Sequence, residues 1–311
     1  MNATPRRTVP AERLDTLTTE AYRPELADID RLDTLAIARA MNAEDASVAA
    51  AVAERLPEIA AAVDAVAARM ARGGRLVHAG AGTAGRLGVL DAAECPPTFG
   101  TSPGQVVGVI AGGPRAVVSS VEGAEDSAEA GRADLEALDI GRDDTVVGIS
   151  ASGRTPYALG AVEHARARGA LTVGLACNRD SALAAACDHG IEVVVGPELI
   201  AGSTRLKAGT AQKLVLNTLS TITMIRLGKT YGNLMVDLRA TNEKLRARSR
   251  RIVSLATGAP DHEVERALAA NGGQVKHAIL TLLADVDGPT AARLLEDSAG
   301  RLRAALAAAA D

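Results

Sequence analysis

The sequence predicts an α/β protein whose doubly wound, five-stranded parallel sheet is covered by helices on both faces. Short apolar runs alternate with helical segments through the first part of the chain, which is the pattern of a parallel sheet buried on both sides. Toward the C-terminal end the pattern changes to short helical segments without strands. We therefore expect residues 1–245 to form the sheet domain, with an N-terminal helical segment, and residues 246–311 to form a small all-helical domain.

The expected strands are short runs rich in Val, Ile and Leu. They cover residues 76–79, 105–111, 145–149, 171–176 and 191–195. Before them, residues 44–72 have an Ala-rich helical pattern that stops at a Gly-Gly pair. The helix after the first strand should end near Glu94, because the Pro-Pro pair that follows cannot continue it. After the last strand, residues 203–226 predict a long helix, and breaks at 258–260 and 271–273 divide the end of the chain into three short helices.

The composition excludes several classes of function. Aromatic residues make up only 1% of the 311 residues and the net charge is −4, so stacking on bases and nucleic-acid binding are both disfavoured. Cys95, Cys177 and Cys187 lack CxxC spacing and the five histidines share no spacing, so we expect neither a disulfide framework nor a metal site. No apolar run is long enough to span a membrane, and residues 1–15 lack the apolar stretch of a signal peptide. The sequence therefore predicts a cytoplasmic protein that binds neither nucleic acid nor membrane.

Three loops rich in glycine and hydroxyl groups follow expected strands, which is where an open parallel sheet binds its ligands. They cover residues 80–86, 150–156 and 202–210. Each could be a simple turn with a helix cap, but backbone N–H groups and hydroxyls at three helix starts together favour a phosphate-bearing small molecule. The residues that we expect to bind it are Gly82, Thr83, Arg86, Ser150, Ser152, Gly153, Thr155, Ser203, Thr204 and Lys207.

The first loop also matches the GxGxxG pattern of dinucleotide-binding proteins, through Gly80, Gly82 and Gly85. That pattern needs a carboxylate at the end of the next strand to hold the ribose. Here the strand over 105–111 is followed by Gly-Gly-Pro, which supplies no carboxylate. The GK[ST] ending of a Walker loop is missing as well. We therefore expect no nicotinamide or flavin cofactor.

Five long motifs span most of the chain. They are GAGTAGRLGVLDAAECPPTFG (80–100), VEGAEDS (121–127), VVGISASGRTPY (146–157), GSTRLKAGTAQKLVLNTLST (202–221) and YGNLMVDLRATNEKL (231–245). Together they resemble the sugar isomerase domain family, which binds phosphosugars, and more closely the N-acetylmuramic acid 6-phosphate etherases within it. The chain departs from that family where Ala84 replaces a usual serine and where residues 18–24 lack a usual Arg-Asn pair. The resemblance implies a flavodoxin-like sandwich, a ubiquitin-associated-like C-terminal domain and a homodimer.

The resemblance also implies a reaction. Members of the family are metal-independent lyases that cleave the D-lactyl ether at C3 of the 6-phosphorylated amino sugar, in the recycling of cell-wall sugar. Elimination of D-lactate followed by addition of water gives N-acetylglucosamine 6-phosphate, and these steps need one group that accepts a proton and one that donates it. By the resemblance, Glu94 donates a proton to the departing lactate and Glu125 is the partner acid or base. Which of the two removes the C2 proton stays open.

Two other classes of function stay in view. A phosphosugar-binding regulatory protein would keep the three loops without needing a carboxyl pair. An aldose–ketose isomerase would handle similar phosphosugars without eliminating a lactyl group. The presence of both Glu94 and Glu125, in a chain long enough for only one such domain, favours the lyase.

Overall fold

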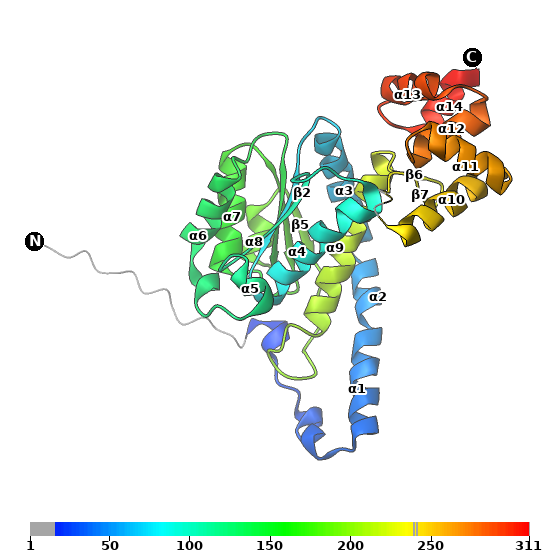
Figure 1. Cartoon of the computed structure of the whole chain (residues 1–311). Helices are drawn as coiled ribbons and strands as arrows, with labels where there is room; N and C mark the ends of the chain where they lie inside the picture. Colours follow the sequence, from blue (N-terminus) through cyan, green and yellow to red (C-terminus); the bar gives the residue numbers. More distant parts are fainter. Residues whose placement is uncertain (1–15, 239, 241, 311) are drawn as a thin grey trace, which may run out of the picture.

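A five-stranded parallel sheet forms the centre of the protein, as predicted (Figure 1). The computed structural model describes residues 16–238, 240 and 242–310, so the segment 1–15 considered above lies outside the described residues. The strands are β1 (Leu76–Gly80), β2 (Val106–Ile110), β3 (Thr145–Ser150), β4 (Leu171–Ala176) and β5 (His189–Glu192). Their order is β2-β1-β3-β4-β5, with every neighbouring pair parallel. Only β5 differs clearly from its prediction, since it begins and ends earlier than residues 191–195.

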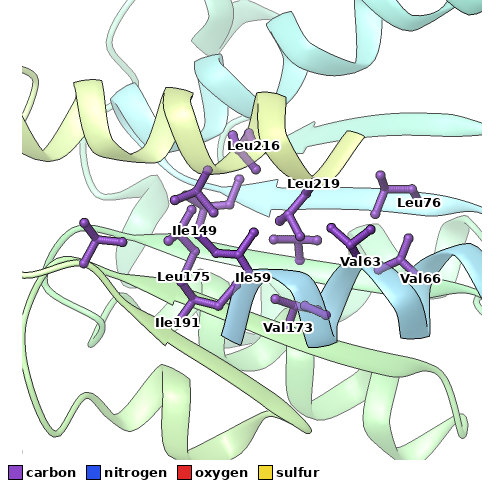
Figure 2. Packing of buried hydrophobic residues seen from close by; sticks show 14 of the residues in the cluster. Ile59, Val63, Val66, Leu76, Ile149, Val173, Leu175, Ile191, Leu216 and Leu219 are labelled. Atoms are coloured by element: carbon purple, nitrogen blue, oxygen red, sulfur yellow. The ribbon is translucent and has the colours of Figure 1, made fainter. Parts of the chain in front are cut away.

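Helices cover both faces of the sheet, and each face has its own apolar core. On one face lie α2 (Val48–Ala53), α3 (Leu56–Met70), α4 (Gly82–Phe99) and α9 (Lys207–Arg226). Figure 2 shows this core, where side chains of α3 and α9 meet those of β3, β4 and β5. On the other face lie α6 (Ala128–Ala137), α7 (Pro156–Ala167) and α8 (Ala182–Ala186). Neighbouring strand residues alternate between the faces, so Leu76 belongs to the first core and Val77 to the second.

The N-terminal helical segment is divided more finely than predicted. Three 3-10 turns come first: η2 (Thr18–Glu20), η3 (Pro24–Leu26) and η4 (Ile29–Arg31). The single helix expected over 44–72 is three helices, α1 (Thr34–Ala46), α2 and α3. Asp33 caps α1 by accepting from the N–H of Ala36, and Pro57 lies in the first turn of α3. Proline has no N–H to donate, so it fits a first turn and interrupts a continuing helix.

The helix after β1 runs further than the sequence predicted. We expected it to end near Glu94, but α4 continues through Pro96 and Pro97 to Phe99. The two prolines fall in its last turns, where Gly100 ends the helix by donating its N–H to the carbonyl of Pro96. Phe99 is buried in the first core and anchors this end of the helix. Glu94 therefore lies within a helix rather than at its exit. The short α5 (Arg115–Val118) and η5 (Ala124–Asp126) follow β2.

The C-terminal region is helical, as predicted, but contains more helices than expected. Within the described residues it holds five: α10 (Glu243–Thr257), α11 (Asp261–Ala270), α12 (Val275–Ala284), α13 (Gly288–Asp297) and α14 (Leu302–Ala310). The small antiparallel pair β6 (Thr230–Tyr231) and β7 (Leu234–Met235) precedes them. A separate apolar core extends from Val236 to Ala305. The predicted boundary after residue 245 falls inside α10, and the division into two domains stays a prediction. No helix in the described part of the chain is long and apolar enough to cross a membrane.

A buried polar cluster ties α4 to β1 and α9 on one face of the sheet. Asp91 of α4 lies 3.0 Å from the Nε2 of His78, and its other oxygen accepts from Asn217 at 2.8 Å and from Ser220 at 2.9 Å. A carboxylate can only accept, so Nε2 of His78 carries the hydrogen. Burial alone would raise the pKa of Asp91, but these hydrogen bonds outweigh it and hold the pKa below its usual range.

Replacing Asp91 should therefore destabilise the fold. Asp91→Ala leaves three donors on β1 and α9 unsatisfied, and we expect the free energy of unfolding in urea to fall by about 3 kcal/mol at pH 7. The matched control is Asp64→Ala, which removes a largely exposed carboxylate 3.7 Å from Arg226 and should cost less than about 0.5 kcal/mol.

The same network sets a pH dependence. The folded-state pKa of Asp91 is lowered, so its hydrogen bonds contribute fully to the free energy of unfolding above the ordinary pKa of about 4. That contribution is lost as the pH falls through the lowered pKa. If Asp91→Ala and Asp64→Ala had the same free energy of unfolding at pH 7, the stabilising role of Asp91 would be contradicted.

Candidate functional site

The main cavity lies where the strand order switches direction, at the carboxyl ends of β1 and β3. β1 continues into α4 on one face of the sheet, and β3 leads into α7 on the other face. The starts of these two helices therefore flank one crevice, as in other open parallel sheets. The cavity measures about 440 Å³ and is lined by residues 81–84 after β1, by the last two residues of β3 (149–150) and by 151–152 and 154–156 after it.

The loop after β3 carries a compact group of hydroxyls. The buried Ser150 places its Oγ 2.7 Å from the Oγ1 of Thr155 and 3.2 Å from the Oγ of Ser152. The same Oγ accepts from the N–H of Gly153 at 3.0 Å, which holds the turn closed. The N-cap residue of α7, Thr155, makes no capping hydrogen bond through its side chain. Hydroxyls and an uncapped helix N-terminus together suit an anion with several oxygens.

The loop after β1 depends on two glycines for different reasons. Gly82 has a φ of +53°, a left-handed conformation that favours glycine, and it lines the cavity. Gly85 lies under the turn, where a Cβ would come within 2.6 Å of the carbonyl oxygen of Gly80. That close approach lets α4 begin directly against the end of β1. The N-cap residue of α4 is Ala81, which has no polar side chain, so neither helix start at the cavity is capped by its own N-cap residue.

The third loop contributes less to the cavity than the sequence suggested. Thr204 lines it, but the first N–H groups of α9 are already taken by the buried Glu198, which accepts from the N–H of Lys207 at 2.9 Å and of Ala208 at 3.0 Å. The ammonium of Lys207 lies 2.6 Å from a carboxylate oxygen of Glu44. Glu198 therefore occupies the anion position of this helix.

The predicted binding residues divide into two groups. Those that line the cavity are Gly82, Thr83, Ser150, Ser152, Thr155 and Thr204. Those that do not line it are Arg86, Gly153, Ser203 and Lys207. A direct role for each residue in binding stays a prediction.

The structure separates the two predicted glutamates. Glu125 lies on η5 and lines the cavity. Glu94 is exposed on α4 and is not among the described residues that line the cavity. The neighbouring Cys95 is buried, and burial raises the pKa of its thiol to about 12, which argues against a thiolate nucleophile there.

Four polar residues line the cavity although the sequence analysis did not select them. They are Glu20, Asp126, Arg154 and Gln212. Glu20 belongs to the N-terminal segment. Two hydrogen bonds hold this segment in place, because the N–H of Thr18 donates to Asn178 and the N–H of Gly202 donates to the carbonyl of Thr19. Contacts over such sequence distances leave no local pattern. Arg154 could have been selected from the sequence, because it lies inside the predicted loop over 150–156.

Comparisons with known proteins decide the family. Family models match residues 58–166, as the N-terminal SIS domain of glucokinase regulatory protein, and residues 124–222, as an SIS (sugar isomerase) domain. An N-acetylmuramic acid 6-phosphate etherase from Streptomyces coelicolor is 78% identical over 309 residues, which cover 99% of each chain. A protein of the same name from Rubrobacter xylanophilus is 61% identical, over 95% of this chain and 97% of its own. This chain belongs to the N-acetylmuramic acid 6-phosphate etherase family.

These matches confirm the resemblance that the five sequence motifs indicated. Among solved structures, a phosphoheptose isomerase from Francisella tularensis is similar over 62% of this chain and 100% of its own, with 19% identity and a TM-score of 0.48. The described residues contain no group of three or more His, Cys, Asp or Glu side chains that could hold a metal ion.

Proposed function

We propose that this protein is an N-acetylmuramic acid 6-phosphate etherase, a carbon–oxygen lyase that converts its substrate into N-acetylglucosamine 6-phosphate and D-lactate. The observation that carries the proposal is the near-complete match to etherases at up to 79% identity. The cavity supports it, because hydroxyls, two helix starts and the carboxyl groups of Glu20, Glu125 and Asp126 line one hollow. A regulatory protein would not need a carboxyl group for proton transfer.

We assign the phosphate of the sugar to the loop before α7. Ser152 and Thr155 line the cavity there and can turn their hydroxyls toward an anion. The uncapped N-terminus of α7 adds a favourable field for a dianion. Arg154 adds a positive charge at the same wall. The phosphate thus fixes one end of the sugar and leaves the other end toward α4.

The reaction then needs proton transfers at C2 and at the C3 oxygen. With the sugar ring open, the C1 aldehyde makes the C2 proton acidic enough for a carboxylate to remove. The electron pair left at C2 forms a double bond to C3, the C3–O bond breaks, and the lactate oxygen receives a proton. Water then adds at C3 and C2 regains a proton. Glu125 lines the cavity and is our candidate for one of these proton transfers.

We infer that the protein works as a homodimer in which Glu94 reaches the cavity of the partner. Glu94 is exposed, so it is free to meet another surface. As the proposed proton donor to lactate it must approach a bound substrate, and in its own chain it does not line the cavity. A two-fold pair would complete both sites in the same way. We further propose that the enzyme acts in the cytoplasm, where its three free cysteines stay reduced.

Purified wild-type protein should release D-lactate from N-acetylmuramic acid 6-phosphate, measured with a lactate dehydrogenase assay. Glu125→Gln should lower kcat by about 10²- to 10⁴-fold, the usual contribution of a general acid or base, and leave the affinity for N-acetylglucosamine 6-phosphate nearly unchanged. Glu129→Gln, an exposed change on α6, should retain full activity. Tight fructose 6-phosphate binding without lactate release by the wild type would overturn the proposal and favour a regulator.

Co-expression of Glu94→Gln with Glu125→Gln tests the shared site. Each variant alone should be nearly inactive. Random pairing makes half of the dimers mixed, and one of the two sites in a mixed dimer would be intact, so the mixture should regain about a quarter of wild-type activity. A mixture no more active than either variant alone would show that Glu94 does not act across a dimer.

A further inference from the structure

A second, smaller hollow opens beside the main cavity and shares a wall with it. It measures about 150 Å³. Ala81, Gly82 and Glu125 line both hollows. The rest of the small hollow is built from α4, the residue after β2, α5, the loop between α5 and η5, and the start of η5. Glu125 therefore stands at the boundary between the two spaces.

The distinctive side chain of this small hollow is Arg86. It is half-buried on α4, and its Nε donates to the carbonyl oxygen of Val117 at 3.0 Å. That bond orients the guanidinium plane, while the two Nη groups donate to no described residue. No carboxylate in the described part of the chain lies within ion-pair distance of Arg86. In contrast, the partly buried Arg75 is paired with Asp144 at 2.6 Å. An oriented, half-buried guanidinium without an acidic partner, at the wall of a hollow, is arranged for an external anion.

We propose that Arg86 binds the carboxylate of the lactyl group, and that the small hollow is the lactyl subsite. This inference rests on the proposed function. The substrate carries two anions at opposite ends, a phosphate on C6 and a carboxylate on the lactyl group at C3. Hydroxyls and helix N–H groups near Ser152 suit the phosphate, whereas a planar guanidinium suits a carboxylate through two parallel hydrogen bonds.

The position of Glu125 is consistent with this division. The bond that breaks joins the sugar to the lactyl group, so it must cross the boundary between the sugar space and the lactyl space. Glu125 lines both spaces and can therefore reach the atoms on either side of that bond. Glu122 also lines the small hollow, and its charge and that of Glu125 disfavour an anion on their side. The carboxylate is thus directed to the wall that Arg86 forms.

The volume agrees with the same assignment. A lactyl group adds five non-hydrogen atoms beyond the ether oxygen, and a hollow of about 150 Å³ has room for it. A phosphosugar without that group would leave the hollow filled with water. Arg86 therefore distinguishes the substrate from its sugar product, because only the substrate presents a carboxylate there.

The test compares two ligands on the same variants. Arg86→Met should raise the KM for N-acetylmuramic acid 6-phosphate by about 10- to 100-fold, as expected when hydrogen bonds to a charged group are lost. The affinity for N-acetylglucosamine 6-phosphate, measured by calorimetry, should change less than about twofold, since that ligand lacks the lactyl group. Arg115→Met removes an exposed guanidinium from the neighbouring α5, outside the hollow, and should leave both values unchanged.

The outcomes separate the subsite from a structural role and from the proposed function. Arg86→Met also removes the bond to Val117, so Arg86→Lys serves as a second variant that keeps the charge and should give an intermediate KM. An equal loss of affinity for both ligands, or an unchanged KM, would overturn the subsite. Failure of the wild type to release D-lactate would instead overturn the proposed function and this inference with it.

Discussion

The change of direction in the strand order between β1 and β3 is the constraint on which the rest of the site depends. It sends α4 to one face of the sheet and α7 to the other, so two helix N-termini meet at one crevice. The close contact of Gly85 with the end of β1 brings α4 to that edge, and the buried Asp91 cluster fixes the same helix against α9. The hydroxyl loop before α7 completes the opposite wall. An anion site at this edge follows from topology before any charged side chain is considered.

Much of this could be predicted from the sequence, because the relevant signals are local. Val- and Ile-rich runs marked the strands, and loops of glycine and hydroxyl residues marked the carboxyl edge. The failures involve contacts between distant segments. The capping of α9 by Glu198 and the pairing of Lys207 with Glu44 redirect a loop that looked like an anion site. Glu20 enters the cavity through an N-terminal segment whose docking leaves no periodic pattern. The Pro-Pro pair also gave a wrong end for α4. The helix continues past both prolines to Phe99, whose side chain is buried.

The account assigns separate tasks to separate parts of one substrate. In our proposal, neutral hydroxyls and helix N–H groups hold the phosphate, an oriented guanidinium receives the lactyl carboxylate, and carboxyl groups move protons between the two ends. Because Glu125 belongs to the walls of both hollows, chemistry and recognition meet at a single residue. We propose that the exposed Glu94 acts on the substrate that a partner subunit binds. Loss of Arg86 should therefore raise the KM, whereas loss of Glu125 should mainly lower kcat.

The most direct test of the central claim is a crystal structure with N-acetylglucosamine 6-phosphate bound. The account predicts the phosphate within hydrogen-bond distance of the Ser152 and Thr155 hydroxyls at the start of α7, with the sugar extending toward Gly82 and Glu125. A phosphate bound at the start of α9, or against Arg86, would contradict it, because the site would then not be organised by the crevice between β1 and β3.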